Sequence, residues 1–402
     1  MTEPKSISIM GSTGSIGTSA AAVITHANGA SEAPVYSVDT LVAGHDVKGL
    51  ARQALDLQAS LAVIADPDGY LELKSLLQGS GIEIAAGEAA VTEAAARPVH
   101  RVLAAIVGID GLNSTFSAVR AGNSVALANK ESMVCAGPLL KAEAARTGVD
   151  LVPTDSEHNA MFQVMDRLED VERLILTASG GPFRSRSAAE LANVGREDAL
   201  AHPKWTMGQK ISIDSATLFN KGLELIEAAY LFDMPSDRID VVVHPQSIVH
   251  SLVTYRDGSV LAQLGNPDMQ TPIAYALSWP ERRQPTSVPP LDLVSLGQLD
   301  FEALDSEKFP SVGLARSALE LGGGAPTVLN SANECAVAAF LAGQCGFNDI
   351  SRVVEKTLDR FVSNGVARER CESVEAVMTI NLEARRLATE LLDSIAFEPE
   401  RS

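Results

Sequence analysis

The strongest constraint on the fold lies at the N-terminus. A strand-like stretch, Ser6 to Met10, runs directly into Gly11-Ser12-Thr13-Gly14-Ser15-Ile16-Gly17, and a helix-compatible stretch, Thr18 to Thr25, follows. Glycines in such a turn let backbone amides approach a pyrophosphate, and the N-terminus of the next helix favours its negative charge. The spacing is GxxGxxG rather than GxGxxG, so a simple tight turn is the alternative. The order of strand, glycine turn and helix favours a nucleotide site.

Strands and helices continue to alternate through the first third of the chain. Val35 to Val42, Leu61 to Ala65 and Val102 to Val107 are predicted strands, and Ser114 to Ala121 is a predicted helix. This alternation is typical of a parallel sheet covered by helices. We therefore expect an α/β protein whose first domain, residues 1–150, is a Rossmann-like parallel sheet that binds the dinucleotide.

The tip of the second strand normally meets the adenosine ribose of a dinucleotide, where an acid favours NAD and a base favours the 2′-phosphate of NADP. Here the tip reads Gly44-His45-Asp46, which combines both kinds of side chain. Asp39 lies within the strand, where it could simply be a polar edge position. Local chemistry therefore leaves the choice between NAD and NADP open.

Two later strand ends carry charged residues. A predicted strand that starts at Ser124 leads into Asn129-Lys130-Glu131, at the edge where open α/β sheets bind ligands; a surface lysine is the alternative reading of Lys130. A second short strand, Val149 to Val152, precedes Asp155 and Glu157, whose side chains point to one side of an extended chain. Adjacent acids repel unless a cation lies between them. We therefore weigh a divalent metal site against a solvated acidic loop.

Two loops in the middle of the chain suit a phosphorylated ligand. The first contains Ser179-Gly180-Gly181, which offers backbone amides and a hydroxyl to an oxyanion; a plain turn is the alternative. The second places His202, Trp205 and Met207 beside Gly208, which suggests a lid that closes over a ligand and excludes water. The alternative is that Trp205 fills a core beneath the loop.

The stretch after the second loop should form a helix with a polar face. Asp214 or Ser215 could cap that helix. Within it, Asn220, Lys221 and Glu224 share one face because they are three and four residues apart. They form either a surface ion pair or, together with Ser215, a phosphate site in which Glu224 turns toward a metal. With the two earlier acids, Glu224 would complete an all-oxygen ligand set that suits Mg²⁺ or Mn²⁺ better than zinc.

Two predicted strands, Val241 to His250 and Ser259 to Leu264, should pair in antiparallel fashion. His244 and His250 would share a sheet face if the strand is regular, and they could be core or interface residues as readily as ligands. Val241 to Val243 is a candidate sheet edge for self-pairing, which allows a homodimer.

The rest of the chain is predicted to form three segments: an α+β domain for metal and substrate binding and dimerisation with a mixed sheet at 151–279, a proline-rich linker at 280–300 and a C-terminal helical domain at 301–402. Apolar residues recur at helical spacing from Ile350 to Val362 and from Leu387 to Leu392, which is more typical of a core than of a binding site. Asn330 and Glu334 could make hydrogen bonds across a domain boundary.

Composition excludes several classes of protein. A formal charge of −19 argues against a nucleic-acid partner, and no apolar run is long enough to span a bilayer. We expect no secretion leader, because a strand-like stretch rather than a charged-then-apolar one follows the first residues, and the four cysteines lack CxxC spacing. We therefore expect buried thiols in a reducing compartment, and a cytoplasmic enzyme with a small-molecule substrate and no membrane partner.

The motifs that carry a family resemblance occur in this order along the chain: Gly11 to Gly17, Ala128 to Ser132, Asp155 to Ala160, Ala178 to Phe183, His202 to Gly208, Asn220 to Glu224, His244 to His250, Gly265 to Pro272, and Asn330 to Glu334. In these motifs the chain resembles the 1-deoxy-D-xylulose 5-phosphate reductoisomerase family of the non-mevalonate isoprenoid pathway. The resemblance implies a homodimeric enzyme that uses NADPH and a divalent metal, Mg²⁺ or Mn²⁺. It would rearrange and reduce 1-deoxy-D-xylulose 5-phosphate to 2-C-methyl-D-erythritol 4-phosphate.

The resemblance also implies roles for individual residues. The metal ligands would be Asp155, Glu157 and Glu224, which with Lys130 and His202 would form the catalytic set. The substrate contacts would be Lys130, Ser156, Glu157, Ser179, His202, Ser215, Asn220, Lys221 and Glu224, with Trp205 and Met207 from a flap. The cofactor contacts would be Thr13, Gly14, Ser15, Ile16, Gly44, His45, Asp46, Asn129, Glu131 and Gly208.

Two positions depart from the family pattern. Family members often carry Lys or Arg before Asn where this chain has His45-Asp46, which weakens the expected preference for NADPH over NADH. Gln270 stands where Arg is common, and we attach no function to it. A metal-independent NAD(P) dehydrogenase of a small phosphorylated substrate and a non-catalytic nucleotide-sensing module are the alternative functions.

Overall fold

The computed structural model of the chain describes residues 3–201, 208–281, 285–363 and 371–396. The chain divides into two compact units, each of which is described by itself. Unit 1 comprises Met1–Ser132, Leu140–Phe162 and Asp268–Pro290, and unit 2 comprises Met133–Leu139, Gln163–Pro267 and Leu291–Ser402. The predicted domain boundaries at residues 150, 279 and 300 remain a prediction.

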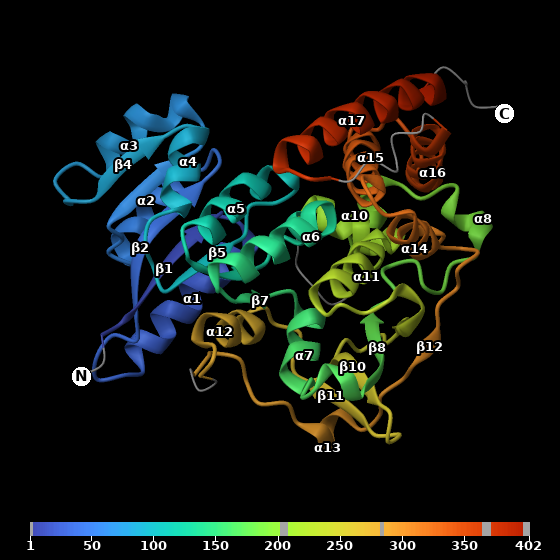
Figure 1. The fold of residues 1–402 in the computed structure, drawn as a ribbon, viewed down its shortest axis with the longest axis horizontal. Helices are drawn as coiled ribbons and strands as arrows, with labels where there is room; N and C mark the ends of the chain where they lie inside the picture. Colours follow the sequence, from blue (N-terminus) through green and yellow to red (C-terminus); the bar gives the residue numbers. More distant parts are fainter. Residues whose placement is uncertain (1–2, 202–207, 282–284, 364–370, 397–402) are drawn as a thin grey trace. The chain divides into compact units, whose positions relative to one another are not determined.

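Unit 1 is built on a parallel sheet of seven strands in its described residues (Figure 1). The strands are β1 (Lys5–Met10), β2 (Tyr36–Ala43), β3 (Leu61–Ile64), β4 (Glu83–Ala86), β5 (Arg101–Ala104), β6 (Ser124–Leu127) and β7 (Leu151–Pro153). Their order is β4-β3-β2-β1-β5-β6-β7, and every pair is parallel. The chain progresses outward in both directions from β1 and β5, and the crevice at the carboxyl ends of two such strands is where open α/β sheets bind ligands. The predicted Rossmann-like sheet is confirmed.

Helices from both early and late parts of the chain belong to unit 1. They are α1 (Ser15–Gly29), α2 (Val47–Asp56), α3 (Tyr70–Leu76), α4 (Glu88–Ala95), α5 (Leu112–Arg120) and α12 (Gln270–Ser278), with short 3-10 turns at Pro67–Gly69 and Ile109–Gly111. Helices α6 (Lys130–Thr147) and α7 (Ser156–Val164) have residues assigned to both units.

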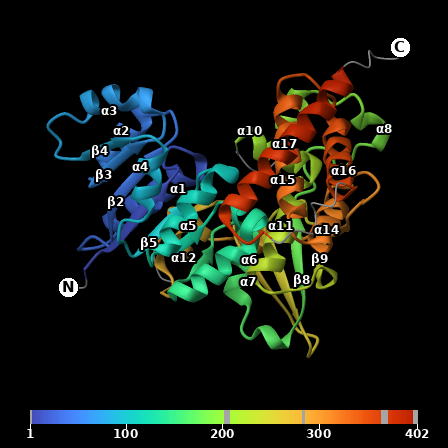
Figure 2. The ribbon, with the colours of Figure 1, turned by 45° about the horizontal axis from the view of Figure 1, so that its top comes forward.

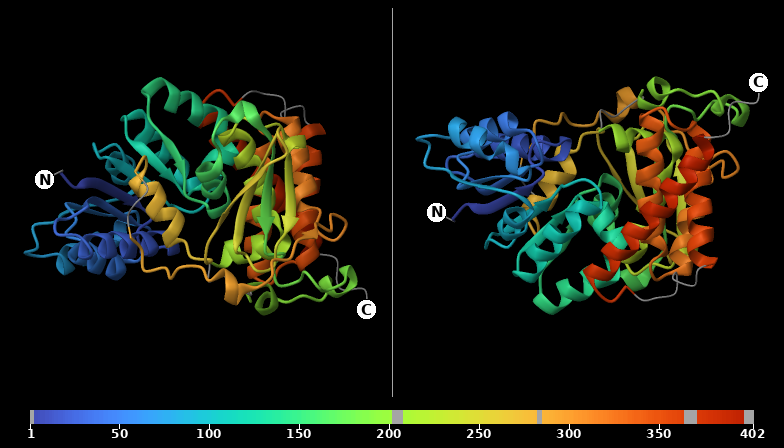
Figure 3. Two further views of the ribbon diagram at one scale, coloured as in Figure 1. Left: turned by 90° about the horizontal axis from the view of Figure 1, so that it is seen from below. Right: turned by 90° about the horizontal axis from the view of Figure 1, so that it is seen from above.

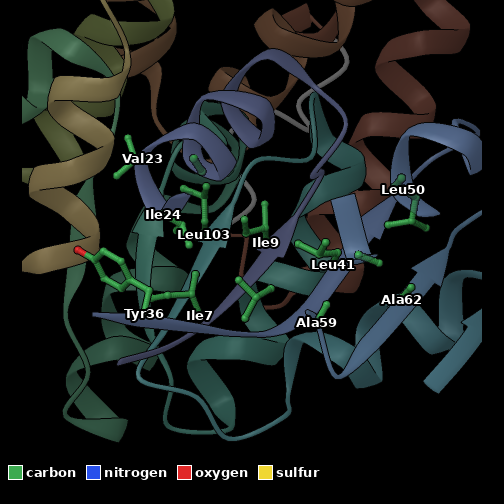
Figure 4. Packing of buried hydrophobic residues seen from close by; sticks show 14 of the residues in the cluster. Ile7, Ile9, Val23, Ile24, Tyr36, Leu41, Leu50, Ala59, Ala62 and Leu103 are labelled. Carbon is green, nitrogen blue, oxygen red and sulfur yellow. The ribbon is translucent and has the colours of Figure 1, made fainter. Parts of the chain in front are cut away.

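The core of unit 1 forms because β-branched and leucine side chains alternate along the strands and small or branched residues recur every three to four positions along α1. Figure 4 shows Ile7 and Ile9 of β1 beside Leu103 of β5, with Val23 and Ile24 of α1 packed over them. All five side chains are at most 1% exposed. This packing holds α1 against the sheet and so positions the turn between β1 and α1.

Unit 2 contains a mixed sheet, which confirms the expected α+β architecture. Its strands are β8 (Val171–Ala178), β9 (Ile239–Val243), β10 (Val249–Tyr255), β11 (Val260–Leu264) and β12 (Glu302–Ala303), in the order β11-β10-β8-β9-β12 among the described residues. Only the pair β8 and β9 is parallel within this described sheet. Strands β8, β9, β10 and β11 are among the green and yellow arrows in Figure 3.

The helices of unit 2 are α8 (Ala188–Leu191), α9 (Arg196–Leu200), α10 (Gln209–Thr217), α11 (Phe219–Leu231), α13 (Leu293–Leu296), α14 (Ser311–Leu321), α15 (Ala325–Leu341), α16 (Phe347–Ser363) and α17 (Val374–Ala396), with 3-10 turns at Leu168–Asp170 and Ser236–Arg238. The helical C-terminal part is confirmed, and α15 lies beside α17 in Figure 2. The predicted apolar stripe of α16 is buried at Ile350, Val354 and Phe361, whereas Val362 is 41% exposed.

Two predictions about the sheet of unit 2 are wrong. The stretch from Val241 to His250 is not one strand, because β9 ends at Val243 and β10 begins at Val249. Val241 to Val243 is not the sheet edge either, because β12 pairs with it. The edge with more exposed apolar surface is β11, where Val260 and Leu261 are 50% and 46% exposed.

Among the described residues, no helix has the length and apolarity needed to cross a bilayer.

Candidate active site

The glycine turn after β1 can accept neither a side chain at its start nor one at its end. A Cβ at Gly11, whose φ is +95°, would lie 2.5 Å from the carbonyl oxygen of Ala105. A Cβ at Gly17 would lie 2.4 Å from the carbonyl oxygens of both Gly11 and Ser12. Gly14 is the exposed N-cap of α1, whose first turn carries no acid. The turn therefore presents backbone amides and a helix N-terminus at the carboxyl end of β1, as a pyrophosphate requires.

The side chain of Gln53 on α2 also supports this turn. Its Nε2 donates to the carbonyl oxygen of Ser12 at 3.0 Å, a normal length for such a hydrogen bond. Thr13, Gly14, Ser15 and Ile16, the predicted cofactor contacts, lie partly or fully exposed on the turn that Gln53 braces. Sequence patterns did not identify Gln53, because it lies 41 residues from its partner.

The tip of β2 contains interactions that its local sequence did not reveal. His45 Nδ1 lies 3.1 Å from Asp66 Oδ2, and Asp46 caps α2 by accepting from the amide of Gly49 at 2.9 Å. Asp39 is occupied elsewhere, because Arg97 donates to both of its carboxylate oxygens at 2.7 and 3.1 Å. Burial raises the pKa of Asp39, but the hydrogen bonds from Arg97 and a neighbouring hydroxyl outweigh burial and lower it. Asp39 is therefore a polar residue of β2 that pairs with Arg97, in line with the expectation that it could simply be a polar position of the strand.

Asn129 connects two strand ends at the same edge of the sheet. Its side-chain amide donates to the carbonyl oxygens of Ile106 and Gly108 at 2.6 and 2.8 Å and to Glu131 Oε2 at 3.1 Å. Its carbonyl oxygen accepts from the amide of Ser132 at 2.9 Å and so caps α6. Asn129 is 2% exposed and Glu131 5% exposed. Asn129 therefore holds the loop after β5 in place, and Glu131 accepts from the same side-chain amide.

Lys130 and the first acids meet at the ends of β6 and β7. Lys130 Nζ lies 2.5 Å from Asp155 Oδ2, and their side chains are 12% and 15% exposed. Ser156 donates its amide to Asp155 at 2.9 Å and its hydroxyl to Glu157 Oε2 at 2.6 Å. The structure of unit 1 thus brings four of the predicted site residues together, with a cation paired to one of two neighbouring carboxylates.

In unit 2, the predicted phosphate loop packs against α10. Gly181 has φ +65°, and a Cβ there would lie 2.8 Å from the carbonyl oxygen of Ser215. The amide of Gly181 also donates to Ser179 Oγ at 3.2 Å. Gly180, with φ +81°, completes the left-handed pair that turns the chain after β8. Ser179 and Ser215 therefore belong to adjoining segments of one unit.

The polar face of α11 is buried, so it is not a surface ion pair. Lys221 Nζ and Asn220 Nδ2 both donate to the carboxylate of Glu224. The side chains of Lys221 and Glu224 are 5% and 0% exposed. The two donors on its own helix hold the Glu224 carboxylate in place, and burying a charged carboxylate costs free energy that such partners must offset.

Comparison with known proteins identifies the family. The family model described as 1-deoxy-D-xylulose 5-phosphate reductoisomerase matches residues 7–137, and two models of the C-terminal domain of that enzyme match residues 151–232 and 264–387. The 1-deoxy-D-xylulose 5-phosphate reductoisomerase of Caulobacter vibrioides is 52% identical over 395 residues, which cover 98% of either chain. This chain belongs to the 1-deoxy-D-xylulose 5-phosphate reductoisomerase family.

Solved structures of the family superimpose closely on this chain. The reductoisomerase of Zymomonas mobilis in complex with NADPH has a TM-score of 0.90 and 47% identity, and the match covers 98% of this chain and 100% of that one. A second reductoisomerase, in complex with NADPH, fosmidomycin and magnesium, has a TM-score of 0.93 and 41% identity with the same coverage.

The prediction that Asp214 or Ser215 caps the helix of Asn220 and Glu224, which is α11, is wrong. Asp214 and Ser215 lie inside α10, and α11 starts after Leu218, which has φ +61° and no side-chain cap. Asp214 instead accepts from Asn333 Nδ2 at 2.8 Å and pairs with Lys210 at 2.5 Å. The left-handed Leu218 makes the corner that turns from α10 into α11.

His244 is a core residue rather than a ligand. It is 0% exposed, its Nδ1 lies 2.8 Å from the carbonyl oxygen of Asp300, and its Nε2 accepts from the amide of Ile248 at 3.2 Å. Because Nε2 accepts, the ring is neutral and Nδ1 donates. His250 is also buried, at 8% exposure. Asn330 bonds to Glu334 at 3.0 Å within α15, and Glu334 pairs with Arg385 of α17.

Several predicted site residues have no described structure. His202, Trp205 and Met207 lie outside the described residues, and Gly208 is the N-cap of α10 at their border. The remaining predicted residues fall at the strand ends of unit 1, on the loop after β8 or on the α10–α11 segment of unit 2.

Proposed function

We infer that this chain catalyses the NADPH- and divalent-metal-dependent conversion of 1-deoxy-D-xylulose 5-phosphate to 2-C-methyl-D-erythritol 4-phosphate. The observation that carries this conclusion is the 52% identity to a reductoisomerase over 98% of both chains. A metal-independent dehydrogenase is not favoured, because relatives with the same fold were solved with NADPH and with magnesium.

The residues of this chain fit both groups. Gly11 and Gly17 leave a turn in which a Cβ would collide with the backbone, so amides rather than side chains face the place of a pyrophosphate. Asp155, Glu157 and Glu224 offer only hard oxygen donors, which suit Mg²⁺ or Mn²⁺. When bound, the divalent cation supplies Lewis-acid polarisation of substrate oxygens and the nicotinamide supplies the hydride.

We propose that these three acids are the metal ligands and that Lys130 contacts the substrate. The ion pair with Asp155 holds the Lys130 ammonium in a nearly buried position, where it can donate to substrate oxygens on which charge develops. Ser156, which already orients Glu157, is the second proposed substrate contact in unit 1. His202 completes the proposed catalytic set.

The substrate phosphate is proposed to bind in unit 2. Ser179 and Ser215 lie on segments that touch through Gly181, and Asn220 and Lys221 follow on the next helix. A hydroxyl, an amide and an ammonium are the donors that a phosphate accepts. Trp205 and Met207 are proposed to close over the substrate. The proposed cofactor contacts are Thr13, Gly14, Ser15, Ile16, Gly44, His45, Asp46, Asn129, Glu131 and Gly208.

The decisive experiment follows NADPH absorbance with substrate and Mg²⁺ or Mn²⁺. NADPH should be oxidised only when both substrate and metal are present, and chelation followed by dialysis should stop the reaction. Glu224→Gln should lower kcat by orders of magnitude and weaken Mn²⁺ binding measured by calorimetry. Glu320→Gln, which changes an exposed acid on α14, is the matched control and should do neither.

Two outcomes would contradict the proposal. Absence of NADPH oxidation with 1-deoxy-D-xylulose 5-phosphate would defeat the activity itself. Full turnover after chelation would defeat the metal assignment and restore the metal-independent alternative.

A cytoplasmic homodimer is the proposed state of the chain, and no nucleic-acid or membrane partner is proposed. The edge strand β11 supports self-association, because an exposed apolar edge offers unpaired backbone groups to a second copy. Leu261→Lys should shift the mass measured by light scattering toward that of the monomer. Leu71→Lys, at a residue of unit 1 that is 76% exposed, should leave the mass unchanged.

A further inference from the structure

The inner face of α10 carries a buried carboxylate, that of Asp214. Its side chain is 1% exposed, and each of its two oxygens has a partner of its own. Asn333 of α15 donates from Nδ2 to Oδ1 at 2.8 Å, and Lys210 Nζ, one turn earlier on α10, lies 2.5 Å from Oδ2. Burying a carboxylate costs free energy unless such partners satisfy it. The two contacts therefore fix the orientation of this side chain and tie α10 to α15, which lies beside it (Figure 1).

Helix α10 depends on such tertiary contacts, because its own sequence does little to stabilise it. It has nine residues, its N-cap Gly208 offers no side-chain hydrogen bond, and Lys210 places a cation in the first turn, where the helix dipole disfavours it. A helix of this length is marginal in isolation. Asp214 offsets the charge of Lys210. A second buried link follows at Thr217, whose carbonyl oxygen accepts from Ser311 Oγ of α14 at 2.7 Å.

The residue after Asp214 is Ser215, one of the proposed phosphate contacts. Ser215 is partly exposed, whereas Asp214 and Ala216 on either side of it are buried. A Cβ at Gly181 would lie 2.8 Å from the carbonyl oxygen of Ser215, so the loop that carries Ser179 is in close contact with the last turn of α10. The place of the Ser215 hydroxyl relative to Ser179 therefore depends on where α10 is held.

We propose that Asn333 is a positioning residue for the substrate phosphate, and that it acts through Asp214 on the turn of α10 that carries Ser215. This inference rests on the proposed function. A phosphate is held by several donors at once, and each must lie within hydrogen-bond distance of an oxygen, so a small displacement of one donor weakens the site. The helical C-terminal part of the chain thereby acquires a role in substrate affinity in addition to its packing.

The test compares the steady-state kinetics of the parent protein and Asn333→Leu, which replaces the amide by an apolar group of similar size and removes the donor to Asp214 Oδ1. The KM for 1-deoxy-D-xylulose 5-phosphate should rise about tenfold, the effect of one lost hydrogen bond, whereas kcat should change much less. The inhibition constant of inorganic phosphate should rise by a similar factor. The dissociation constant of NADPH, measured by calorimetry without substrate, should stay unchanged, because the glycine turn belongs to unit 1.

Variants of Asp214 show whether Asn333 acts through it. Asp214→Leu should raise KM as Asn333→Leu does, and the double variant Asp214→Leu/Asn333→Leu should raise it no further, because the second substitution has no contact left to break. The double variant also leaves no carboxylate at this position without a donor, so it replaces Asn333→Leu in the assay if that variant does not fold. Asp214→Asn keeps an oxygen that accepts from Asn333 and should keep KM near the parent value.

Ser331→Ala is the matched control, because it breaks another buried hydrogen bond of the same helix. Ser331 Oγ donates to Asn381 Oδ1 of α17 at 2.8 Å. This contact links α15 to α17 rather than to α10. Its loss should lower the thermal midpoint, as the loss of the Asn333 contact does, but it should leave KM and the inhibition constant of phosphate unchanged.

The inference is overturned if Asn333→Leu keeps the parent KM, if Ser331→Ala raises KM to the same extent, or if the two substitutions of the double variant raise KM independently. These failures differ from a failure of the proposed function. A parent protein that does not oxidise NADPH with the substrate contradicts the function, whereas normal turnover of the parent with an unchanged KM in Asn333→Leu contradicts only the role of Asn333.

Discussion

Replacing Lys221 by Met tests whether the buried polar face of α11 holds a charged carboxylate. The substitution keeps the apolar stem of the side chain and removes only the ammonium that donates to Glu224. Because Glu224 is 0% exposed, water cannot replace that donor without rearrangement. Asn220 still donates to the carboxylate, but a neutral amide offsets much less charge.

The expected loss of unfolding free energy is limited by the free energy needed to protonate Glu224, because protonation removes the unpaired buried charge. Removing one partner of a buried ion pair typically costs about 3–5 kcal/mol. A glutamate with an ordinary pKa of about 4.3 can be neutralised at pH 7 for roughly 3.7 kcal/mol, at 1.36 kcal/mol per pH unit. The loss of unfolding free energy should therefore be about 3–4 kcal/mol at pH 7, and only about 1 kcal/mol at pH 5. The sign is that of a carboxyl whose folded pKa is raised, so the variant regains stability relative to the parent as the pH falls.

Urea denaturation followed by circular dichroism at pH 5 and pH 7 measures this difference. The double variant Lys221→Met/Glu224→Gln should be more stable than the single variant at pH 7, because no buried charge is left without a counter-ion. Arg386→Met, which breaks the exposed pair with Glu383, is the control and should show a much smaller loss. An equal loss at pH 5 and pH 7, or a double variant no better than the single one, would refute the reasoning.

Two further predictions use residues of unit 1. Gly17→Ala should abolish NADPH binding measured by calorimetry while the far-ultraviolet dichroism stays near that of the parent protein, because its Cβ would lie 2.4 Å from two carbonyl oxygens of the turn; retained binding would show that the turn relaxes. Arg97→Gln should lower the thermal midpoint at pH 7, and the difference from the parent protein should vanish in acid. The reason is that the pKa of Asp39 is lowered by its pairing with Arg97. The pairing therefore stabilises the fold above the ordinary carboxyl pKa of 3.8, and this stabilisation is lost as the pH falls through the lowered pKa. A difference that persists well below that value would contradict the assignment.

The sequence predicted the sheet of unit 1 because its signals are local. Glycines between Met10 and Thr18 mark a turn that few other residues could make, and apolar runs of four to eight residues mark buried strands. The charged residues at strand ends were found for the same reason. Lys130 and Asp155 each follow a strand by two or three residues, and ligands of parallel sheets bind at that edge.

Other features were missed because a tertiary contact overrides the local preference. Leucine favours a regular helix, yet Leu218 adopts φ +61° and is 3% exposed, so packing rather than propensity places the break between α10 and α11. Asp214 looked like a cap for that break, but its partners Lys210 and Asn333 hold it inside α10. Asn333 lies too far from Asp214 along the chain for a local sequence pattern to reveal this contact.

The strand register explains how two pairs of residues that are distant along the chain come to meet. Leu127 pairs with Pro153, and the ion pair of Lys130 and Asp155 follows three and two residues later. Ala43 pairs with Ile64, and His45 meets Asp66 two residues beyond each. Once the strand order is known, residues at equal or nearly equal offsets beyond neighbouring parallel strands are candidate partners. The order itself depends on which helices cover which face, and α12, which packs on α1 after a separation of about 250 residues along the chain, shows that this information is not local.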